Sequence, residues 1–495
     1  MLKLIAHIKM TTRRSLRQVA AALRVGNWQA QSARLLSYAA MLTLLMLPVS
    51  CSMFDTNVED CQPNTGNATT YLQVKIQVAG DSNTRALGGE DGDGREEGVN
   101  RENDVNNVTI FLYEARKGIN EADADIKAAF YISGLTGDYT NGYTGKKEIT
   151  KEFTSGMLTA GKTYHVLVVA NMGDMTSWKN EKLAGIRNKI IENAWTPAAD
   201  IKDYSNFVMT SESDEKTLVL EAGKGTEDDP YSVETQIERV AARIDFDWEG
   251  STPSTDNSLK YIYNVTTAGG STPIGKLVLT HVMPFNEMNA GSYCIKRVTN
   301  ENTTEGTNYL GDELPSKSGA NQTNYVIDPY WEAKSTNSLA TTNYKSYFVN
   351  EDAAKAVTDD AINKWPVSKL SAVATNKYGI LDYTQENTSS DNKKAYSTGL
   401  IFRGTYYTNA QWDVTNNKPN GGETGETKTY VYYIRHCTHG DYTSDTETDT
   451  SHPMLHGIVR NNIYRIKINK VLENGIEWKI LVKPWALYRH SDIIM

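Results

Sequence analysis

The stretch YLQVKIQVAGDSNTRALGGEDGDG, residues 71–94, sets the expected fold class of this chain. Its first eight residues alternate apolar and polar side chains, and this period of two predicts a half-buried β-strand. The apolar positions are Leu72, Val74, Ile76 and Val78. The glycine-rich acidic segment 88–98 cannot bury apolar surface and is predicted to form a loop. Arg85 lies at the junction, within reach of a trypsin-like protease.

Further strand patterns follow along the first half of the chain. NNVTIFLYEA has apolar residues at every second position, and GKTYHVLVVANMGD (161–174) contains a continuous apolar run typical of a strand buried on both faces. One helix is predicted between Lys179 and Trp195, because Leu183, Ile186, Ile190 and Ile191 share a helical face. TQIERVAARIDFDW (235–248) is predicted to be a strand that leads out of the first domain.

The second half repeats this organisation after EGSTPSTDNS (249–258), a Ser/Thr/Pro-rich stretch that marks the expected domain boundary. GKLVLTHVMPF, STGLIFRGTYY and TYVYYIRH are short strands separated by polar loops. The expected fold is therefore mainly β, with two tandem β-sandwich domains at residues 86–248 and 249–495.

The first 50 residues differ from the rest. No acid occurs before Asp55, arginines supply positive charge, and an apolar run at residues 39–49 ends in LPVSCS. This pattern is typical of a bacterial lipoprotein signal with lipidation at Cys51, so residues 1–50 are the expected signal and 51–85 a lipidated propeptide. An organellar transit peptide is the alternative, because such peptides are also Arg-rich and poor in acids.

Composition excludes several function classes. The formal net charge of −9 argues against a general nucleic-acid binder, and no zinc-finger spacing, P-loop or dinucleotide-binding glycine pattern occurs. If Cys51 carries lipid, the remaining Cys61, Cys294 and Cys437 are too few and too widely spaced for a disulfide framework.

Two clusters contain residue types that bind metals. His436, Cys437, His439, His452 and His456 lie close together in the sequence, but their spacing fits no familiar zinc site. The segment GGEDGDG lacks the further ligands of a calcium loop. No catalytic motif is present, so neither a metal, a cofactor nor an enzymatic activity is expected.

The carboxyl end predicts a hairpin with one apolar face. VRNNIYRIKINKVL is followed by NGIEWKILVKPW, with Asn474-Gly475 as the expected two-residue turn. The second strand alternates through Ile476, Trp478, Ile480 and Val482. Pro484 has no N–H to donate, so pairing is expected to be interrupted there, at an edge of the sheet.

These segments resemble the fimbrillins of Bacteroidetes, and most of all the minor-fimbrium type. The resemblance rests on VRNNIYRIKINKV followed by VKPW, on VLVVANMGD, and on IERVAARIDF. It implies transthyretin-like sandwich domains, export as an outer-membrane lipoprotein, and cleavage by an arginine-specific protease. Arg85 is then the cleavage point, with Arg95 and Arg101 as fallback sites, and Ala86 becomes the new amino terminus.

The resemblance also implies how such a subunit assembles into a cell-surface fimbrium. Cleavage removes residues 71–78, and the vacated groove accepts the segment 476–485 from a neighbouring copy or another fimbrial subunit. The resemblance names no surface ligand. Two alternatives remain open: a non-polymerising tip, anchor or surface adhesin, and a carbohydrate-binding lipoprotein with an exposed aromatic platform at Trp248, Trp331 or Trp412.

Overall fold

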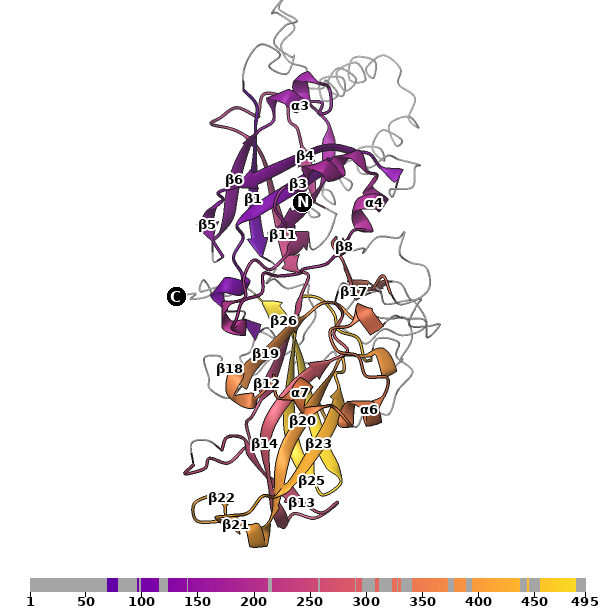
Figure 1. Cartoon of the computed structure of the whole chain (residues 1–495). Coiled ribbons are helices and arrows are strands. Elements are labelled where there is room, and N and C mark those ends of the chain that lie inside the picture. The colour runs from indigo at the N-terminus through magenta and orange to yellow at the C-terminus, as the bar shows by residue number, and fades with distance from the viewer. Residues whose placement is uncertain are drawn as a thin grey trace, which may run out of the picture. The chain divides into compact units, whose positions relative to one another are not determined.

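The computed structural model describes residues 69–78, 96–97, 99–114, 123–139, 141–211, 216–256, 259–289, 291–295, 308–310, 323–326, 328–330, 341–372, 378–388, 394–436, 443–444 and 455–486. The chain divides into two compact units, residues 1–62 and 63–495, and every described residue belongs to the second. The described fold is mainly β, as the sequence predicts (Figure 1).

A nine-stranded sheet forms the first half. Its strand order is β4 (Ile126–Ser133), β3 (Asn107–Tyr113), β7 (Thr163–Ala170), β9 (Met209–Ser211), β11 (Tyr231–Arg239), β1 (Tyr71–Val78), β6 (Gly142–Glu148) and β5 (Thr136–Asp138), with β10 (Thr217–Val219) paired to β7. The sheet folds over on itself, because β4 and β6 meet although they are far apart in this order. A Cβ on Gly145 of β6 would lie 2.8 Å from Cγ2 of Ile132 on β4, so any larger residue would force neighbouring side chains to shift.

An eleven-stranded sheet forms the second half. Its main path is β18 (Ser371–Ala372), β19 (Tyr378–Thr384), β12 (Ala242–Asp247), β25 (Asn462–Leu472), β13 (Ile262–Thr266), β14 (Pro273–Phe285), β20 (Gly399–Thr408) and β23 (Glu426–Tyr433). The long strand β26 (Gly475–Ala486) pairs with β25, and its other edge meets only β2 (Glu96–Glu97) and β24 (Thr443–Ser444) among the described residues.

Small elements connect and cover the two sheets. Three two-stranded pairs are β8 (Ile190–Ile191) with β15 (Ser292–Tyr293), β16 (Asn308–Leu310) with β17 (Thr323–Val326), and β21 (Trp412–Asp413) with β22 (Lys418–Pro419). The α-helices are α3 (Thr150–Thr154), α4 (Leu183–Arg187), α6 (Glu351–Lys355) and α7 (Asp359–Ile362). The 3-10 helices are η1 (Asn100–Glu102), η3 (Thr176–Asn180), η4 (Ile201–Asp203), η6 (Thr341–Asn343), η7 (Val367–Lys369), η8 (Lys394–Tyr396) and η9 (Asn409–Gln411). Within the described part of the chain, none of the helices has the length and apolar character needed to cross a bilayer.

The expected helix between Lys179 and Trp195 is wrong in its extent. Only Leu183–Arg187 is α-helical, and Ile190 and Ile191 form β8 instead. Gly185 and Asn188 have low helix propensity, and pairing of β8 with β15 satisfies the backbone in the extended form. As a result Ile191 is buried whereas Ile190 is 43% exposed.

The expected single strand at residues 235–248 is two strands in different sheets. β11 ends at Arg239, and β12 begins at Ala242 and pairs with β19 and β25 of the second sheet. The chain therefore changes sheet at Val240–Ala241, both fully buried, which is earlier than the boundary expected at residues 248–249. The stretch that begins at Glu249 follows β12 within the second half.

The carboxyl-terminal hairpin is confirmed, with two differences. Leu472 faces Gly475, so the turn residues are Glu473 and Asn474. Pairing also continues through Pro484, since Asn462 faces it and the Trp485 amide donates to the Asn461 carbonyl at 2.9 Å. That bond places Pro484 at a position whose nitrogen points away from β25, where a missing N–H costs no ladder bond.

Candidate assembly site

β1 occupies a central place in the first sheet. It runs parallel to β11, with Leu72 opposite Tyr231 and Val78 opposite Ile237, and antiparallel to β6, with Ile76 opposite Tyr143. Figure 1 shows β1 between these neighbours in the upper part of the molecule. The predicted strand therefore exists with the predicted bounds and is lodged between two partners.

The apolar face of β1 is part of the first core. Leu72, Val74 and Ile76 have no exposed surface, and Val78 is 3% exposed. The intervening polar residues are half-buried on the other face, where Lys75 pairs with Glu234 at 3.3 Å. Burying four such side chains contributes about 6–12 kcal/mol, at about 1.5–3 kcal/mol each. Loss of the strand would leave an apolar slot bounded by the edges of β6 and β11.

Hydrogen bonds fix the beginning of β1. The Tyr71 amide donates to the Gly225 carbonyl at 2.8 Å, and the Thr70 amide donates to Thr150 Oγ1 at 2.9 Å. Gly225 has a φ of +94°, a conformation that glycine adopts without strain, so this turn needs glycine.

Of the residues expected to be lipidated or cleaved, only Arg101 lies in the described part of the chain. Cys51, Arg85, Ala86 and Arg95 lie outside the described residues. The fallback residue Arg101 belongs to η1, and its guanidinium donates to the Ile201 carbonyl and to the Tyr383 hydroxyl, each at 3.1 Å. Because a protease needs an extended and accessible segment, these contacts disfavour Arg101 as a cleavage site.

The expected donor residues lie in the second core. Trp478, Ile480 and Val482 are 5%, 1% and 3% exposed, and Ile476 is half-buried. The Trp478 ring packs 4.3 Å from that of Phe402, centroid to centroid. The structure thus shows Trp478, Ile480 and Val482 buried as predicted, but Leu481 and Lys483 on the opposite face are also buried, at 2% and 3% exposed. It places β26 in the second sheet and β1 in the first, so it does not bring the two predicted segments together.

A buried charged cluster links the two halves, and the sequence reasoning missed it. Glu102 is fully buried; its carboxylate accepts from Arg243 at 3.1 Å, from the Trp485 indole nitrogen at 3.0 Å, and from the Tyr383 hydroxyl. Arg239 donates to the Trp485 carbonyl at 3.0 Å and lies over its ring at 4.6 Å. We call these five residues the junction cluster; they belong to η1, β11, β12, β19 and β26.

Electrostatics in the junction cluster follow from burial and pairing. Burial lowers the pKa of Arg239 to about 10. Burial also opposes the charge of Arg243, but the carboxylates of Asp245 and Glu102 outweigh it and raise the pKa of Arg243. The sequence signal was available: two arginines inside the apolar run of residues 237–246 require buried partners.

The remaining candidates are the two possible metal clusters and the three tryptophans of a sugar-binding platform. Nδ1 of His436 lies 2.8 Å from the Tyr464 hydroxyl, and His456 is largely buried, whereas Cys437, His439, His452, Asp91 and Asp93 lie outside the described residues. No group of three potential metal ligands occurs among the residues that the structure describes. Trp412 is 4% exposed and Trp248 half-buried, so Trp412 does not form the exposed platform expected of a sugar binder; Trp331 is not described.

Residues 70–239 match the family described as "Major fimbrial subunit protein (FimA)". No curated protein matches the sequence. Solved structures with some likeness include a putative cell adhesion protein from Parabacteroides distasonis, at 12% identity and a TM-score of 0.40, covering 85% of this chain and 98% of that one. A fimbrilin (FimA) from Porphyromonas gingivalis has 11% identity and a TM-score of 0.36, covering 85% and 99%.

The C-terminally truncated tip fimbrial protein Mfa3 from Porphyromonas gingivalis is similar at 13% identity and a TM-score of 0.36, covering 84% of this chain and 100% of that one. The matched family segment begins one residue before β1 and ends at the last residue of β11, so it spans the whole first sheet. This match supports the resemblance seen in the sequence for residues 70–239, the part of the chain that is similar to major fimbrial subunits.

Proposed function

We propose that this protein is a structural and adhesive subunit of a cell-surface fimbrium. The observation that carries the proposal is the position of β1: a strand near the beginning of the chain fills a central slot of the first sheet. The family match to a fimbrial subunit supports the same role.

Processing turns this slot into an assembly switch. In the proposed pathway Cys51 carries lipid at the outer membrane, an arginine-specific protease cuts between Arg85 and Ala86, and the fragment that ends at Arg85 departs together with β1. Before the cut, β1 is tethered to its slot and outcompetes any strand from another copy. After the cut, a strand from a neighbour recovers the lost burial and ladder bonds by β-augmentation. Head-to-tail addition of this kind does not close on itself and gives a filament.

The donor is proposed to be the carboxyl-terminal strand, residues 476–485. Because Trp478, Ile480 and Val482 fill the second core, β26 has to leave β25 before it can enter the slot of another copy. Donation by β26 therefore requires the donor subunit to lose the burial of this strand in its own second core. The donor segment is not an unpaired tail.

Limited trypsin digestion of the purified precursor tests the switch. We expect a product that begins at Ala86 and forms SDS-resistant ladders, whereas Arg85→Ala stays uncut at that bond and monomeric. If the wild-type product begins at Ala86 but remains monomeric in size-exclusion chromatography, the polymerisation proposal fails.

A reversible disulfide between β25 and β26 tests the donor. Lys467 and Lys479 are cross-strand partners on the half-buried face, at a spacing that suits a disulfide. With Cys51, Cys61 and Cys437 replaced by serine, Lys467→Cys/Lys479→Cys should form ladders only under reducing conditions. Ladders from the oxidised protein would exclude β26 as the donor. Truncation after Asn474 is a weaker test, because it removes β26 from the second core.

A non-polymerising surface adhesin is the second candidate. The pairing and burial of β26 within its own sheet favour this candidate, because a subunit whose last strand stays in its own core donates no strand to a neighbour. It predicts trimming at Arg85 without ladders under either redox condition.

A further inference from the structure

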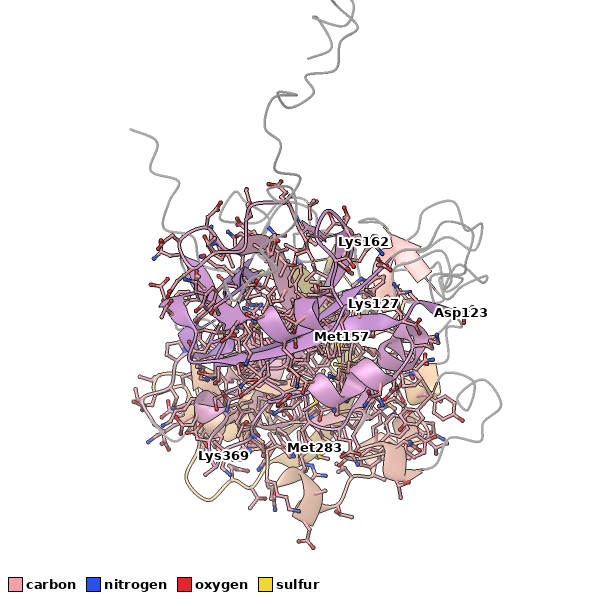
Figure 2. All side chains as sticks on the ribbon, turned by 90° about the horizontal axis from the view of Figure 1, so that it is seen from above. Asp123, Lys127, Met157, Lys162, Met283 and Lys369 are labelled. Carbon is pink, nitrogen blue, oxygen red and sulfur yellow. The ribbon has the colours of Figure 1, made fainter. Side chains whose placement is uncertain are left out.

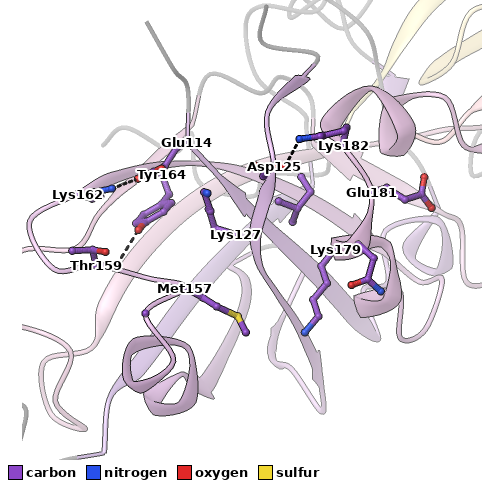
Figure 3. A pocket seen from close by; sticks show the side chains of 13 residues that line it. Glu114, Asp125, Lys127, Met157, Thr159, Lys162, Tyr164, Lys179, Glu181 and Lys182 are labelled. Carbon is purple, nitrogen blue, oxygen red and sulfur yellow. Dashed lines mark hydrogen bonds and ion pairs between the residues drawn. The ribbon is translucent and has the colours of Figure 1, made fainter. Parts of the chain in front are cut away.

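A charged hollow of about 540 Å³ lies beside the first sheet (Figure 3), and none of its lining residues belongs to β1, β6 or β11. Its walls come from the end of β3, the start of β4, the loop after α3, the start of β7, and the segment from η3 to α4. We call it the lysine pocket. Figure 2 shows Lys127, Met157 and Lys162 on one face of the molecule. Its volume is in the range of small-molecule sites.

The carboxylates of the lysine pocket are already neutralised. The pairs are Glu114 with Lys162 at 2.7 Å, Asp125 with Lys182, and Glu181 with Lys189. Lys127 and Lys179 also line the hollow, and among the described residues neither side chain has an ion pair or hydrogen bond (Figure 3). The hollow therefore presents two uncompensated ammonium groups on a chain whose formal net charge is −9.

Backbone geometry singles out Lys127. Leu112 on β3 pairs with Ala128, and the next residue, Tyr113, pairs with Ile126, so Lys127 is the extra residue of a β-bulge. A bulge changes the direction of the side chain that it carries, and bulges are frequent beside binding sites. The bulge is a feature of the strand itself and is independent of the ion pairs around the hollow.

Neutral groups complete the lining. Thr159 and Asn180 supply hydrogen-bonding groups, and Met157, 41% exposed, supplies an apolar surface. A simple inorganic anion would use only the lysines. We propose that the lysine pocket binds a carboxylated sugar, such as a uronic acid unit of an acidic glycan: its carboxylate lies between Lys127 and Lys179, its hydroxyls contact Thr159 and Asn180, and its C–H face covers Met157.

Calorimetric titration of the uncut protein with an oligogalacturonate tests this proposal. The matched neutral ligand is the galactose oligomer of the same length, and sodium sulfate is the inorganic probe. We expect binding of the acidic oligomer alone, with an affinity that falls as salt increases. Lys127→Glu/Lys179→Glu should weaken binding by about tenfold or more. Lys151→Glu is the control, because Lys151 is exposed on α3 of the same domain and does not line the hollow.

Three results would overturn the proposal: equal binding of the neutral oligomer, unchanged affinity in the double variant, or binding of sulfate without binding of the acidic oligomer. Unchanged thermal unfolding of the double variant shows that any loss of binding is local. Polymerisation plays no part in this titration, so a failure here leaves the trypsin result intact, and the reverse also holds.

Discussion

At the scale of single residues, Glu102 is a fully buried charge whose partners come from several elements. Its carboxylate has no exposed surface and also accepts from the Val99 amide at 2.8 Å, in addition to its bonds with Arg243, Tyr383 and Trp485. The segment that follows the proposed cleavage loop is thereby held to β26 and to the second sheet.

Replacing this carboxylate should be costly. Glu102→Gln leaves Arg243 buried with one carboxylate fewer, and we expect a loss of about 3–5 kcal/mol in the free energy of unfolding, measured with urea. The control is Glu249→Gln, which breaks an exposed pair with Lys467 and should cost less than about 1 kcal/mol. Equal losses of unfolding free energy in the two variants would show that the junction cluster stabilises the fold no more than an exposed ion pair does.

His456 should make stability depend on pH. Burial, together with the positive charge of Arg435, lowers its pKa from 6.5 to about 4. Between these values the unfolded chain binds the proton and the folded chain does not, so stability falls as pH falls from about 6.5 towards 4, by about 1.4 kcal/mol per unit.

A variant isolates this contribution from other titrating groups. In urea unfolding at pH 7 and pH 5, wild type should lose up to about 2 kcal/mol more than His456→Gln. The comparison is needed because burial raises the pKa of Glu287 to about 8, which acts in the opposite direction. A parallel pH dependence in the two proteins would rule out His456 as the source.

At the scale of elements, β1 is a strand whose two faces have different energetic weight. Ile76 is fully buried in the first core, whereas Gln73 lies half-buried on the opposite face. Ile76→Ala should lower the free energy of unfolding of the uncut protein by about 2–5 kcal/mol, and Gln73→Ala by about 0.5 kcal/mol or less. After cleavage at Arg85 the two variants should unfold alike, because β1 has left. A difference that survives cleavage would mean that β1 stays bound.

At the scale of the whole molecule, Trp485 connects two cores. It belongs to β26 of the second sheet, yet its ring is fully buried with the first core, where it lies 5.8 Å from the ring of Phe207. Contacts of this kind make the unfolding of two sheets cooperative, since neither can unfold without exposing the shared side chain.

Removing that side chain should uncouple the sheets. Trp485→Ala should cost about 3–5 kcal/mol and split the calorimetric unfolding transition into two. The matched variant is Trp412→Ala: Trp412 is also buried, but it packs with Ile262 and Val278 within the second half. It should lower the transition temperature without dividing the transition. A single transition in Trp485→Ala would contradict the coupling.

The sequence by itself determined the strands and their faces. Period-two alternation identified β1 to the residue, and on β26 it identified Trp478, Ile480 and Val482 as buried, because one face of each strand must leave water. It did not identify Leu481 and Lys483, which are buried on the other face of β26. It also identified the hairpin of β25 and β26, since short-range chain geometry dictates such a pair.

Only the tertiary structure decided where each strand goes. Residues 235–248 look like one strand, but the chain changes sheet at Val240–Ala241 because β12 finds partners in β19 and β25, far away in the sequence. The same holds for Ile190 and Ile191, whose fate depends on β15. The junction cluster and the bulge at Lys127 likewise depend on neighbours that the local pattern does not contain. Local periodicity encodes which side chains are buried, whereas the choice of partner is a long-range property of the folded chain.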